Sequence, residues 1–368
     1  MGNINRVGEI DWNNLVYTSN QADIAKYSLK QDDLLFNRTN SAEWVGKTAI
    51  YKGNKNAIYA GYIIRIRTIS VNADYINYVM NSSYHRDWCD EVKTDAVNQS
   101  NINAQKLSQL YIPIPPYKEQ ERIVNYVQRW TTLINNIEIE KSDLALSVAE
   151  TKFKILDLAI HGKLVPQDPT DEPASVLLKR INPKAEITCD NPQYGKLPNG
   201  WCETLLGNIG TWQSGATPSR LRKEYYGGSI PWLKTGDLND GIVQSIPECI
   251  TERALEETSV KLNPAGSILI AMYGATIGRI GILSKPATTN QACCACVDYL
   301  PEKKFLFYFL LANRENFIAM GGGGAQPNIS KEKIIHTHIP LPPQQEQQRI
   351  VAKIEELFAQ LDNITSSL

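Results

Sequence analysis

The sequence has no long apolar run and no excess of charge of either sign. No stretch of the 368 residues approaches the roughly 18 uninterrupted apolar residues that cross a bilayer. The opening MGNINRVGEIDW lacks a basic region followed by an apolar one, so it does not predict a secretory signal. Lys and Arg number 38 against 39 Asp and Glu, and 42% of the residues are hydrophobic, which excludes global disorder. We therefore expect a cytoplasmic protein of two or three globular units.

Cysteines and catalytic motifs are also sparse. The seven cysteines lack the dense spacing of a disulfide scaffold, so we expect them to be reduced. Cys293, Cys294 and Cys296 have no CxxC pair to complete a zinc site, and the run around them predicts a buried strand. The sequence contains no GxSxG elbow and no P-loop, because Gly321–Gly324 is not followed by Lys and Ser or Thr. We predict no catalytic residue and no metal site.

An internal repeat organises the chain. The segment IPIPPYKEQERIV, which begins at Ile112, recurs as IPLPPQQEQQRIV from Ile339. Five identical positions follow the proline pairs at one constant offset, and Asn101-Ile102 recurs as Asn328-Ile329 at the same offset. Asp33–Phe36 also pairs loosely with Ser267–Ile270. The chain is therefore predicted to hold two similar domains, each followed by a helix.

Helices are predicted to start just after the proline pairs, because proline lacks the N–H of a helix interior but fits its first turn. Apolar residues then recur in alternating steps of four and three, the spacing of a coiled-coil seam. The predicted seam consists of Ile123, Val127, Trp130, Ile134, Ile137, Leu144, Ile350, Ile354, Leu357, Leu361 and Ile364. The alternative is that each stripe packs on its own domain.

The length of the first helix favours a pair. Residues 117 to 161 would extend about 67 Å, too long to lie on one domain of this size. We expect an antiparallel pair with a domain at each end. An overlap of about 25 residues would span about 37 Å.

The expected fold class is α+β, with two mixed α/β domains in tandem. Short β-rich runs bounded by Gly, Asn and Pro alternate with helical patterns in both halves. Residues 163–196 are rich in proline and mixed charge, which is typical of a linker. The predicted divisions are a first domain at 1–116, a central helix at 117–162, a linker at 163–196, a second domain at 197–343 and a distal helix at 344–368.

These segments resemble a known family. The duplicated helix starts, the linker HGKLVPQDPTDEPASVLLKR, and the runs LPNGWCETLLGNI, SGATPS, IPWLKTGDL, YGATIGRIGIL and TTNQACCA are similar to the specificity (S) subunit of type I restriction-modification systems. The likeness spans nearly the whole chain. It implies two target-recognition domains that each read one half of a bipartite target in double-stranded DNA.

The resemblance also implies partners. Two methyltransferase (M) subunits would dock on the helical pair, with restriction-translocase (R) subunits outside them. The chemistry, methylation of adenine and cleavage of DNA, would belong to those partners. S-adenosylmethionine, ATP and Mg²⁺ are accordingly expected in the partner subunits and not in this chain.

Any DNA-binding face must be local, because neither domain is basic overall. The segment Ser219–Tyr226 has cations for phosphates and tyrosines or Arg for base edges. Polar loops after two predicted strands are weaker candidates, and an ordinary solvated loop stays an alternative for each. The candidate DNA contacts are Arg220, Arg222, Lys223, Tyr225, Tyr226, Lys234, Thr235, Tyr273, Thr276, Arg279, Arg38, Thr39 and Asn40.

The two repeats are not equal in length. Through the repeat, residue 1 corresponds to about residue 235, so the first domain is expected to lack about 38 residues and to be truncated at its N-terminus. This leaves open an inactive fragment that serves as a reservoir of recognition sequence for recombination. A third interpretation is a stand-alone adenine methyltransferase. It would rest on Asn191–Tyr194, one residue from an Asn-Pro-Pro-Tyr signature but without a Gly-rich strand before it.

Overall fold

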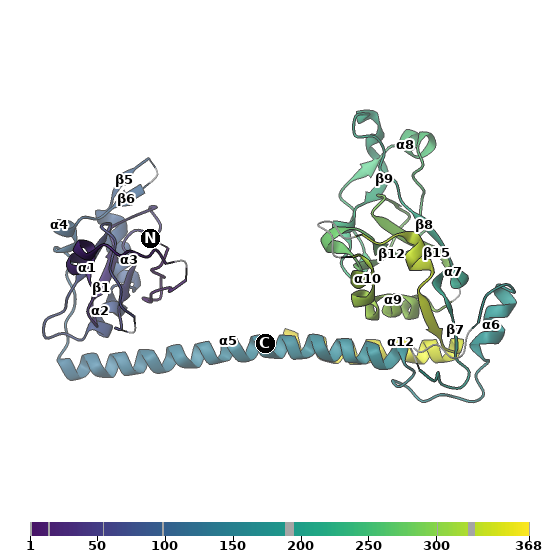
Figure 1. Cartoon of the computed structure of the whole chain (residues 1–368), viewed down its shortest axis with the longest axis horizontal. Helices are drawn as coiled ribbons and strands as arrows, with labels where there is room; N and C mark the ends of the chain where they lie inside the picture. The colour runs from purple at the N-terminus through teal and green to yellow at the C-terminus, as the bar shows by residue number, and fades with distance from the viewer. Residues whose placement is uncertain are drawn as a thin grey trace. The chain divides into compact units, whose positions relative to one another are not determined.

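The computed structural model divides into two compact units, Met1–Glu140 and Lys141–Leu368. It describes residues 2–13, 15–53, 55–97, 99–187, 195–299, 301–322 and 328–367. Asn191–Tyr194 therefore lies outside the described residues, as does part of the glycine run. Each unit mixes helices and strands, as the sequence predicts (Figure 1). Within the described residues, no helix combines the length and the apolar character needed to cross a membrane.

Unit 1 is built on a three-stranded antiparallel sheet in the order β3-β1-β4. A small second sheet, β2-β6-β5, extends from it. Its elements are α1 (Gln21–Tyr27), β1 (Leu34–Asn37), β2 (Thr39–Asn40), β3 (Thr48–Ile50), β4 (Ile63–Ile66), α2 (Ala73–Val79), α3 (Ser83–Val92), β5 (Thr94–Ala96), β6 (Gln99–Asn101) and α4 (Ala104–Leu107). The core lies between the sheet and helices α2 and α3, around the fully buried Leu34, Phe36 and Ile102.

Unit 2 has a five-stranded sheet in the order β10-β13-β12-β15-β8. Its first elements are α6 (Ala174–Ile181), β7 (Cys202–Leu205), α7 (Leu206–Ile209), β8 (Gly210–Ser214), η1 (Lys223–Tyr225), β9 (Tyr226–Leu233), η2 (Thr235–Asp237), β10 (Gly241–Val243), β11 (Cys249–Ile250) and α8 (Glu252–Glu257). The remaining ones are β12 (Ile268–Ala271), η3 (Gly274–Thr276), β13 (Ile280–Leu283), β14 (Thr288–Thr289), β15 (Cys293–Tyr299), α9 (Lys303–Ala312), α10 (Arg314–Met320), α11 (Lys331–Ile335), β16 (His338–Leu341) and α12 (Gln344–Ser366). Cys293, Cys294 and Cys296 are buried in β15, which confirms the predicted buried strand.

The repeat seen in the sequence is also a repeat of structure. β1 lies between β3 and β4 in unit 1 as β12 lies between β13 and β15 in unit 2, with both partners antiparallel. The backbone N–H of Ile102 donates to Arg38 O, and that of Ile329 donates to Met272 O. The loose match of Asp33–Phe36 with Ser267–Ile270 therefore marks the central strand of each unit.

A glutamine explains why the repeated motif is retained. Gln120 accepts from the backbone N–H of Asn72, at 2.9 Å, and donates to Pro115 O. Gln347 accepts from the backbone N–H of Glu302, at 2.7 Å, and donates to Pro342 O. Asn72 and Glu302 are the N-caps of α2 and α9. Each glutamine thus ties the start of a long helix to the start of a helix in its own unit.

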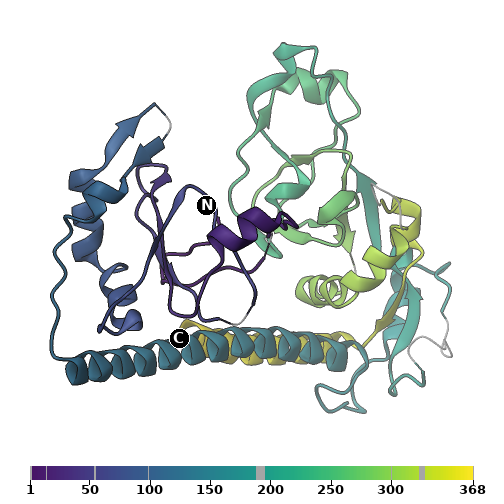
Figure 2. The same cartoon turned by 60° about the vertical axis from the view of Figure 1, so that its left-hand side comes forward.

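Helix α5 (Tyr117–Ile160) begins in unit 1 and ends in unit 2. In unit 2 its last turns pack against α12, and Figures 1 and 2 both show the two helices side by side there. Lys152 forms an ion pair with Asp362 near the end of α12, while Ile155 and Ile160 share a core cluster with Ile350. This order makes the pair antiparallel, as predicted.

In the first half of α5 the structure differs from the predicted coiled-coil seam. Ile123 packs on the core of unit 1 itself, which is the alternative left open by the sequence. Val127 and Leu144 are half-buried, and three expected seam residues are exposed: Trp130, Ile134 and Ile137. Ile350 and Ile354 are fully buried, Leu357 and Leu361 are partly buried, and Ile364 is exposed.

Residues 163–196, which have the composition of a linker, contain ordered structure that belongs to unit 2. Helix α6 places Ala174 and Leu178 in the main core of that unit. Asp171 pairs with Arg349 of α12 at 2.6 Å. The proline-rich composition gives no signal of these contacts, because they are made with residues far away in the sequence.

Candidate DNA interface

The basic residues of the Ser219–Tyr226 segment lie around two carboxylates. Arg220 and Lys234 both pair with Glu248, the lysine at 2.8 Å. The Arg220 guanidinium also lies 4.3 Å from the centre of the Tyr226 ring and 5.0 Å from that of Trp232. Hydrogen bonds from Arg220 and Lys234 lower the pKa of Glu248, so its carboxylate stays charged and holds both cations.

A second carboxylate, Glu257 of α8, holds the other part of the segment. Tyr225 donates from its hydroxyl to Glu257 at 2.9 Å, and Arg222 donates to that hydroxyl at 2.8 Å. Tyr225 is buried in a cluster with Trp232 and Ile250. The Tyr225 ring therefore lies in the core and its hydroxyl is already engaged, so a contact between Tyr225 and DNA stays a prediction that this geometry does not favour.

The loop after the central strand of unit 2 holds three more candidates. Tyr273 and Arg279 are exposed at the two sides of η3, and the Thr276 hydroxyl donates to Tyr273 O at 2.9 Å. The side chains of the loop after β12 are available to a ligand, although the hydroxyl of Thr276 is partly used to fix its own turn.

Thr235 lies in another loop, which follows β9. It is half-buried in η2, and Asp237 caps this short helix by accepting from the backbone N–H of Lys234.

The corresponding loop of unit 1 holds the remaining candidates. Arg38, Thr39 and Asn40 follow β1 directly, as Met272 and Tyr273 follow β12. Thr39 pairs with Asn101 in a short ladder, and Tyr273 pairs with Asn328 in an isolated bridge. The two polar loops, singled out separately in the sequence, are therefore the same structural element in two copies.

Charge distinguishes the candidates from one another. Among the described residues, no ion pair engages the exposed side chains of Arg38, Lys223 and Arg279. Arg220 and Lys234 share one carboxylate, and Arg222 lies 3.5 Å from another. Uncompensated cations attract phosphates most strongly, so Arg38, Lys223 and Arg279 are the best placed for backbone contacts.

Sequence reasoning did not identify Glu248, Glu257 or Trp232. Glu248 and Glu257 lie more than twenty-five residues beyond Arg220 and Arg222, respectively. Strand pairing brings them close, since Cys249 of β11 pairs with Pro231 of β9. No local signal in the sequence could have indicated this pairing.

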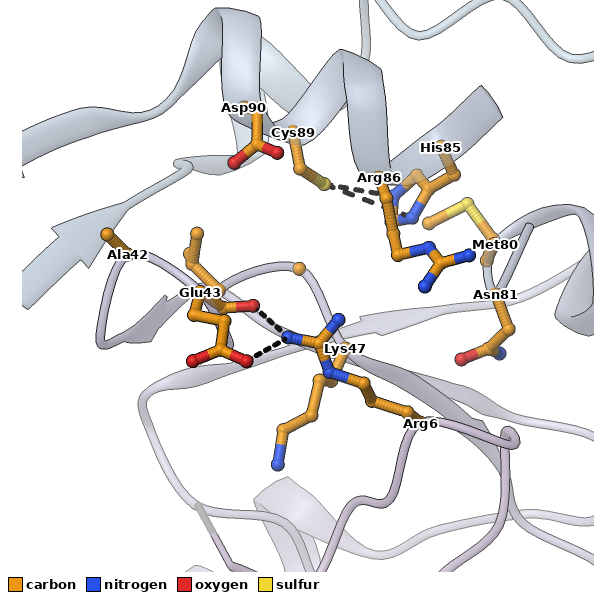
Figure 3. Close-up of a pocket in the computed structure, with 12 residues that line it drawn as sticks. Arg6, Ala42, Glu43, Lys47, Met80, Asn81, His85, Arg86, Cys89 and Asp90 are labelled. Carbon is orange, nitrogen blue, oxygen red and sulfur yellow. Dashed lines mark hydrogen bonds and ion pairs between the residues drawn. The ribbon is translucent and has the colours of Figure 1, made fainter. Parts of the chain in front are cut away.

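A cavity in unit 1 contains a cysteine and a histidine that lack the properties of a nucleophile (Figure 3). Cys89 Sγ lies 3.4 Å from His85 Nε2 on helix α3. Burial raises the pKa of Cys89 to about 12 and lowers the pKa of His85 to about 4. Both groups are therefore uncharged at neutral pH, whereas a reactive cysteine needs a thiolate. Within the described part of the chain, no group of three His, Cys, Asp or Glu side chains could hold a metal.

Comparison with known sequences gives a consistent result. The family described as type I restriction modification DNA specificity domain matches residues 2–145 and 198–367, one copy in each half. The putative type I restriction enzyme MjaX specificity subunit of Methanocaldococcus jannaschii is 26% identical over 365 residues, covering 95% of this chain and 77% of its own. The EcoR124I/EcoR124II specificity subunit of Escherichia coli is 34% identical over 170 residues, 44% of this chain and 41% of its own.

Solved structures show the same fold. A chain from a study of complex assembly in the type I R-M system matches with a TM-score of 0.68 at 18% identity, covering 100% of this chain and 84% of its own. The HsdS subunit from Thermoanaerobacter tengcongensis matches with a TM-score of 0.58 at 17% identity, covering 100% of this chain and 83% of its own. The tandem α+β fold with its coiled coil is thereby confirmed. Specificity subunits are the non-catalytic DNA-recognition components of type I restriction-modification enzymes, and this chain belongs to their family.

Proposed function

We propose that each unit reads one half of a bipartite DNA target and that the helices carry the partner subunits. The observation that supports this most is the polar loop after the central strand, which occurs once in each unit. Two copies of one reading element in a chain fit a target with two parts. The exposed cations Arg38 and Arg279 belong to these two loops, and phosphate contacts from them would fix the position of each unit on the duplex.

The aromatic and paired residues of unit 2 have a supporting role in this proposal. Arg220 stacks on Tyr226 and Trp232 and is held by Glu248, which makes the segment rigid before DNA arrives. A rigid loop loses less conformational entropy on binding. Leu221, at the tip of the same segment, is 94% exposed and is free to contact a thymine methyl or a sugar.

The exposed part of α5 is the proposed docking site for a methyltransferase subunit. Tyr126, Trp130, Leu133, Ile134 and Ile137 form an apolar stripe on this helix, and all five are exposed. Monomeric proteins rarely leave such a stripe open to water, which favours a protein partner. We infer that two M subunits and the R subunits assemble with the chain, and that S-adenosylmethionine, ATP and Mg²⁺ act in those subunits.

The DNA-binding role is tested with the assembled complex of this chain and its M subunits. Lys223→Ala and Arg279→Ala should each weaken binding to all sequences alike and reduce the slope of log K against log salt by about 1. The matched control is Lys163→Ala, an exposed lysine beyond the end of α5. Unchanged affinity and slope in both variants would remove the Ser219–Tyr226 segment and the loop after β12 from the interface. The chain alone, given S-adenosylmethionine, is expected to methylate no DNA.

A further inference from the structure

Unit 1 has an open sheet edge where unit 2 has a covered one. In unit 1, Leu34 pairs with Ile66 of β4, as Ile268 pairs with Cys296 of β15 in unit 2. The other edge of β15 pairs with β8, and Cys293–Cys296 are fully buried. In the part of unit 1 that the structure describes, no strand pairs with the other edge of β4, and all four of its residues are half-exposed.

An apolar pocket lies beside this edge. It has a volume of about 290 Å³, and its lining includes Trp12, Tyr17, Leu29, Leu35, Tyr59 and Ile63. The strand registers make Leu35 equivalent to Leu269 and Ile63 equivalent to Cys293. In unit 2, Leu233 at the end of β9 packs with those two residues and is fully buried. The pocket of unit 1 is therefore the place that a leucine fills in unit 2.

The backbone next to the pocket is paired on one side only: Ile58 forms an isolated antiparallel bridge with Ser28, and among the described residues of unit 1 no strand pairs with its other side. Thr288 and Thr289 of β14, just before β15, pair in parallel with Trp232 and Leu233 of β9. Ile58 and Tyr59 stand at the same distance before β4 and line the pocket. A strand that entered here could pair with this backbone and place its last side chain in the pocket.

A third open place lies before helix α5. Tyr111 and Ile114 are 85% and 59% exposed, although the repeat makes them equivalent to His338 and Leu341 of β16. In unit 2, β16 pairs with β7 and Leu341 is fully buried. An apolar side chain that is buried in one copy of a repeat, as Leu341 is, and exposed in the other, as Ile114 is, indicates an uncovered surface.

One continuous segment covers all three places in unit 2, namely Cys202–Leu233 with its strands β7, β8 and β9. We propose that unit 1 has an acceptor surface, formed by residues 58–66, 111–114 and the apolar pocket, for a strand-forming partner segment of the same chemistry as Cys202–Leu233. Such a segment would extend the sheet of unit 1 at β4 and bury a Leu-sized side chain in the pocket. Addition of a strand at an open edge provides backbone hydrogen bonds, and the pocket provides specificity.

The test uses the full chain and a synthetic peptide of residues 201–233, with Cys202→Ser to prevent oxidation. Hydrogen exchange at Ile63–Ile66 and at residues 111–114 should slow at least tenfold when the peptide is saturating. A peptide with Leu233→Asp should bind at least tenfold more weakly, because it would place a carboxylate in the apolar pocket. A peptide with Leu221→Asp is the matched control and should bind like the parent, since Leu221 is solvent-exposed in unit 2.

These peptide variants leave the folding of the protein untouched. Unchanged exchange at Ile63–Ile66 with the peptide bound, or equal binding of the Leu233→Asp and Leu221→Asp peptides, would overturn the proposal. Failure of the complex to bind DNA would instead count against the proposed function and leave the acceptor surface standing.

Discussion

At the residue scale, the repeated motif depends on one buried glutamine in each unit. Gln347 is fully buried and satisfies a backbone N–H at one helix start and a carbonyl before another. The residue must carry a donor and an acceptor on one rigid end, which an amide does and a carboxylate at neutral pH does not. The recurrence of Glu-Gln after each proline pair thus has a local physical cause.

Gln347→Ala is expected to destabilise unit 2 by about 1–3 kcal/mol, since it leaves the partly buried N–H of Glu302 and the buried C=O of Pro342 without their partner. Thermal unfolding of the full chain measures this as a lower Tm for the transition that includes α12. Gln348→Ala, one position along and exposed, is the matched control and should leave Tm unchanged. Equal Tm values for the two variants would contradict this role.

The neighbouring Glu346 should make stability depend on pH. Burial raises the pKa of Glu346, while Gln167 donates to its carboxylate at 3.2 Å. A carboxyl whose pKa is raised on folding contributes stability below its unfolded value of about 4.5, and this contribution is lost as pH rises through the folded value. Glu346→Gln should therefore raise Tm at pH 7.5, and the gain should shrink as pH falls toward 4.5. A gain that is equal at both pH values would show that charge burial is not the cause.

The sequence predicts the structural position of a single residue only where the residues that it contacts are near it in the chain. The start of α12 at Gln344 and the burial of Cys293–Cys296 follow from proline placement and local apolar character. The burial of Tyr225 depends on Glu257 and on strands that pair across long separations. Tyr226 and Lys223 lie in the same short segment but remain accessible. The local sequence alone therefore cannot distinguish the buried residue from the accessible ones.

At the element scale, helix α5 lies in three environments along its 44 residues. Its first turns pack on the core of unit 1 through Val124, and its last turns pack with α12 through Ile155. All residues from 128 to 143 are exposed. A heptad spacing predicts which face of a helix is apolar, but the same spacing serves a packed domain, a helix pair or an unoccupied surface.

Trp130→Asp tests whether the exposed stripe binds a partner. Because Trp130 is 51% exposed, we expect the Tm of the chain to change by less than about 2 °C, in line with substitutions at the surface. Affinity for the methyltransferase subunit, measured by calorimetry, should fall at least tenfold. Asn135→Asp adds the same charge off the stripe and is the control. If both variants bind the partner like the native chain, the docking site lies elsewhere.

At the scale of the whole molecule, the repeat made the tandem organisation predictable, and the family comparison agrees with it over 2–145 and 198–367. The equivalence of the two polar loops could not be seen in the sequence, because Arg38–Asn40 and Tyr273–Arg279 share almost no residues. Only the shared position of β1 and β12 relates them. If the two loops read DNA as proposed, their sequences are expected to differ because the two units would read different bases, while the strands that hold the loops must pack alike.

The central claim is that this chain gives a methyltransferase complex a target in two separated parts. Long-read sequencing of DNA from cells that carry the M subunits, with and without this chain, measures it directly. The account predicts adenine methylation at a split motif that appears only when the chain is present. Methylation at an uninterrupted motif, or a pattern that is the same without the chain, would contradict it.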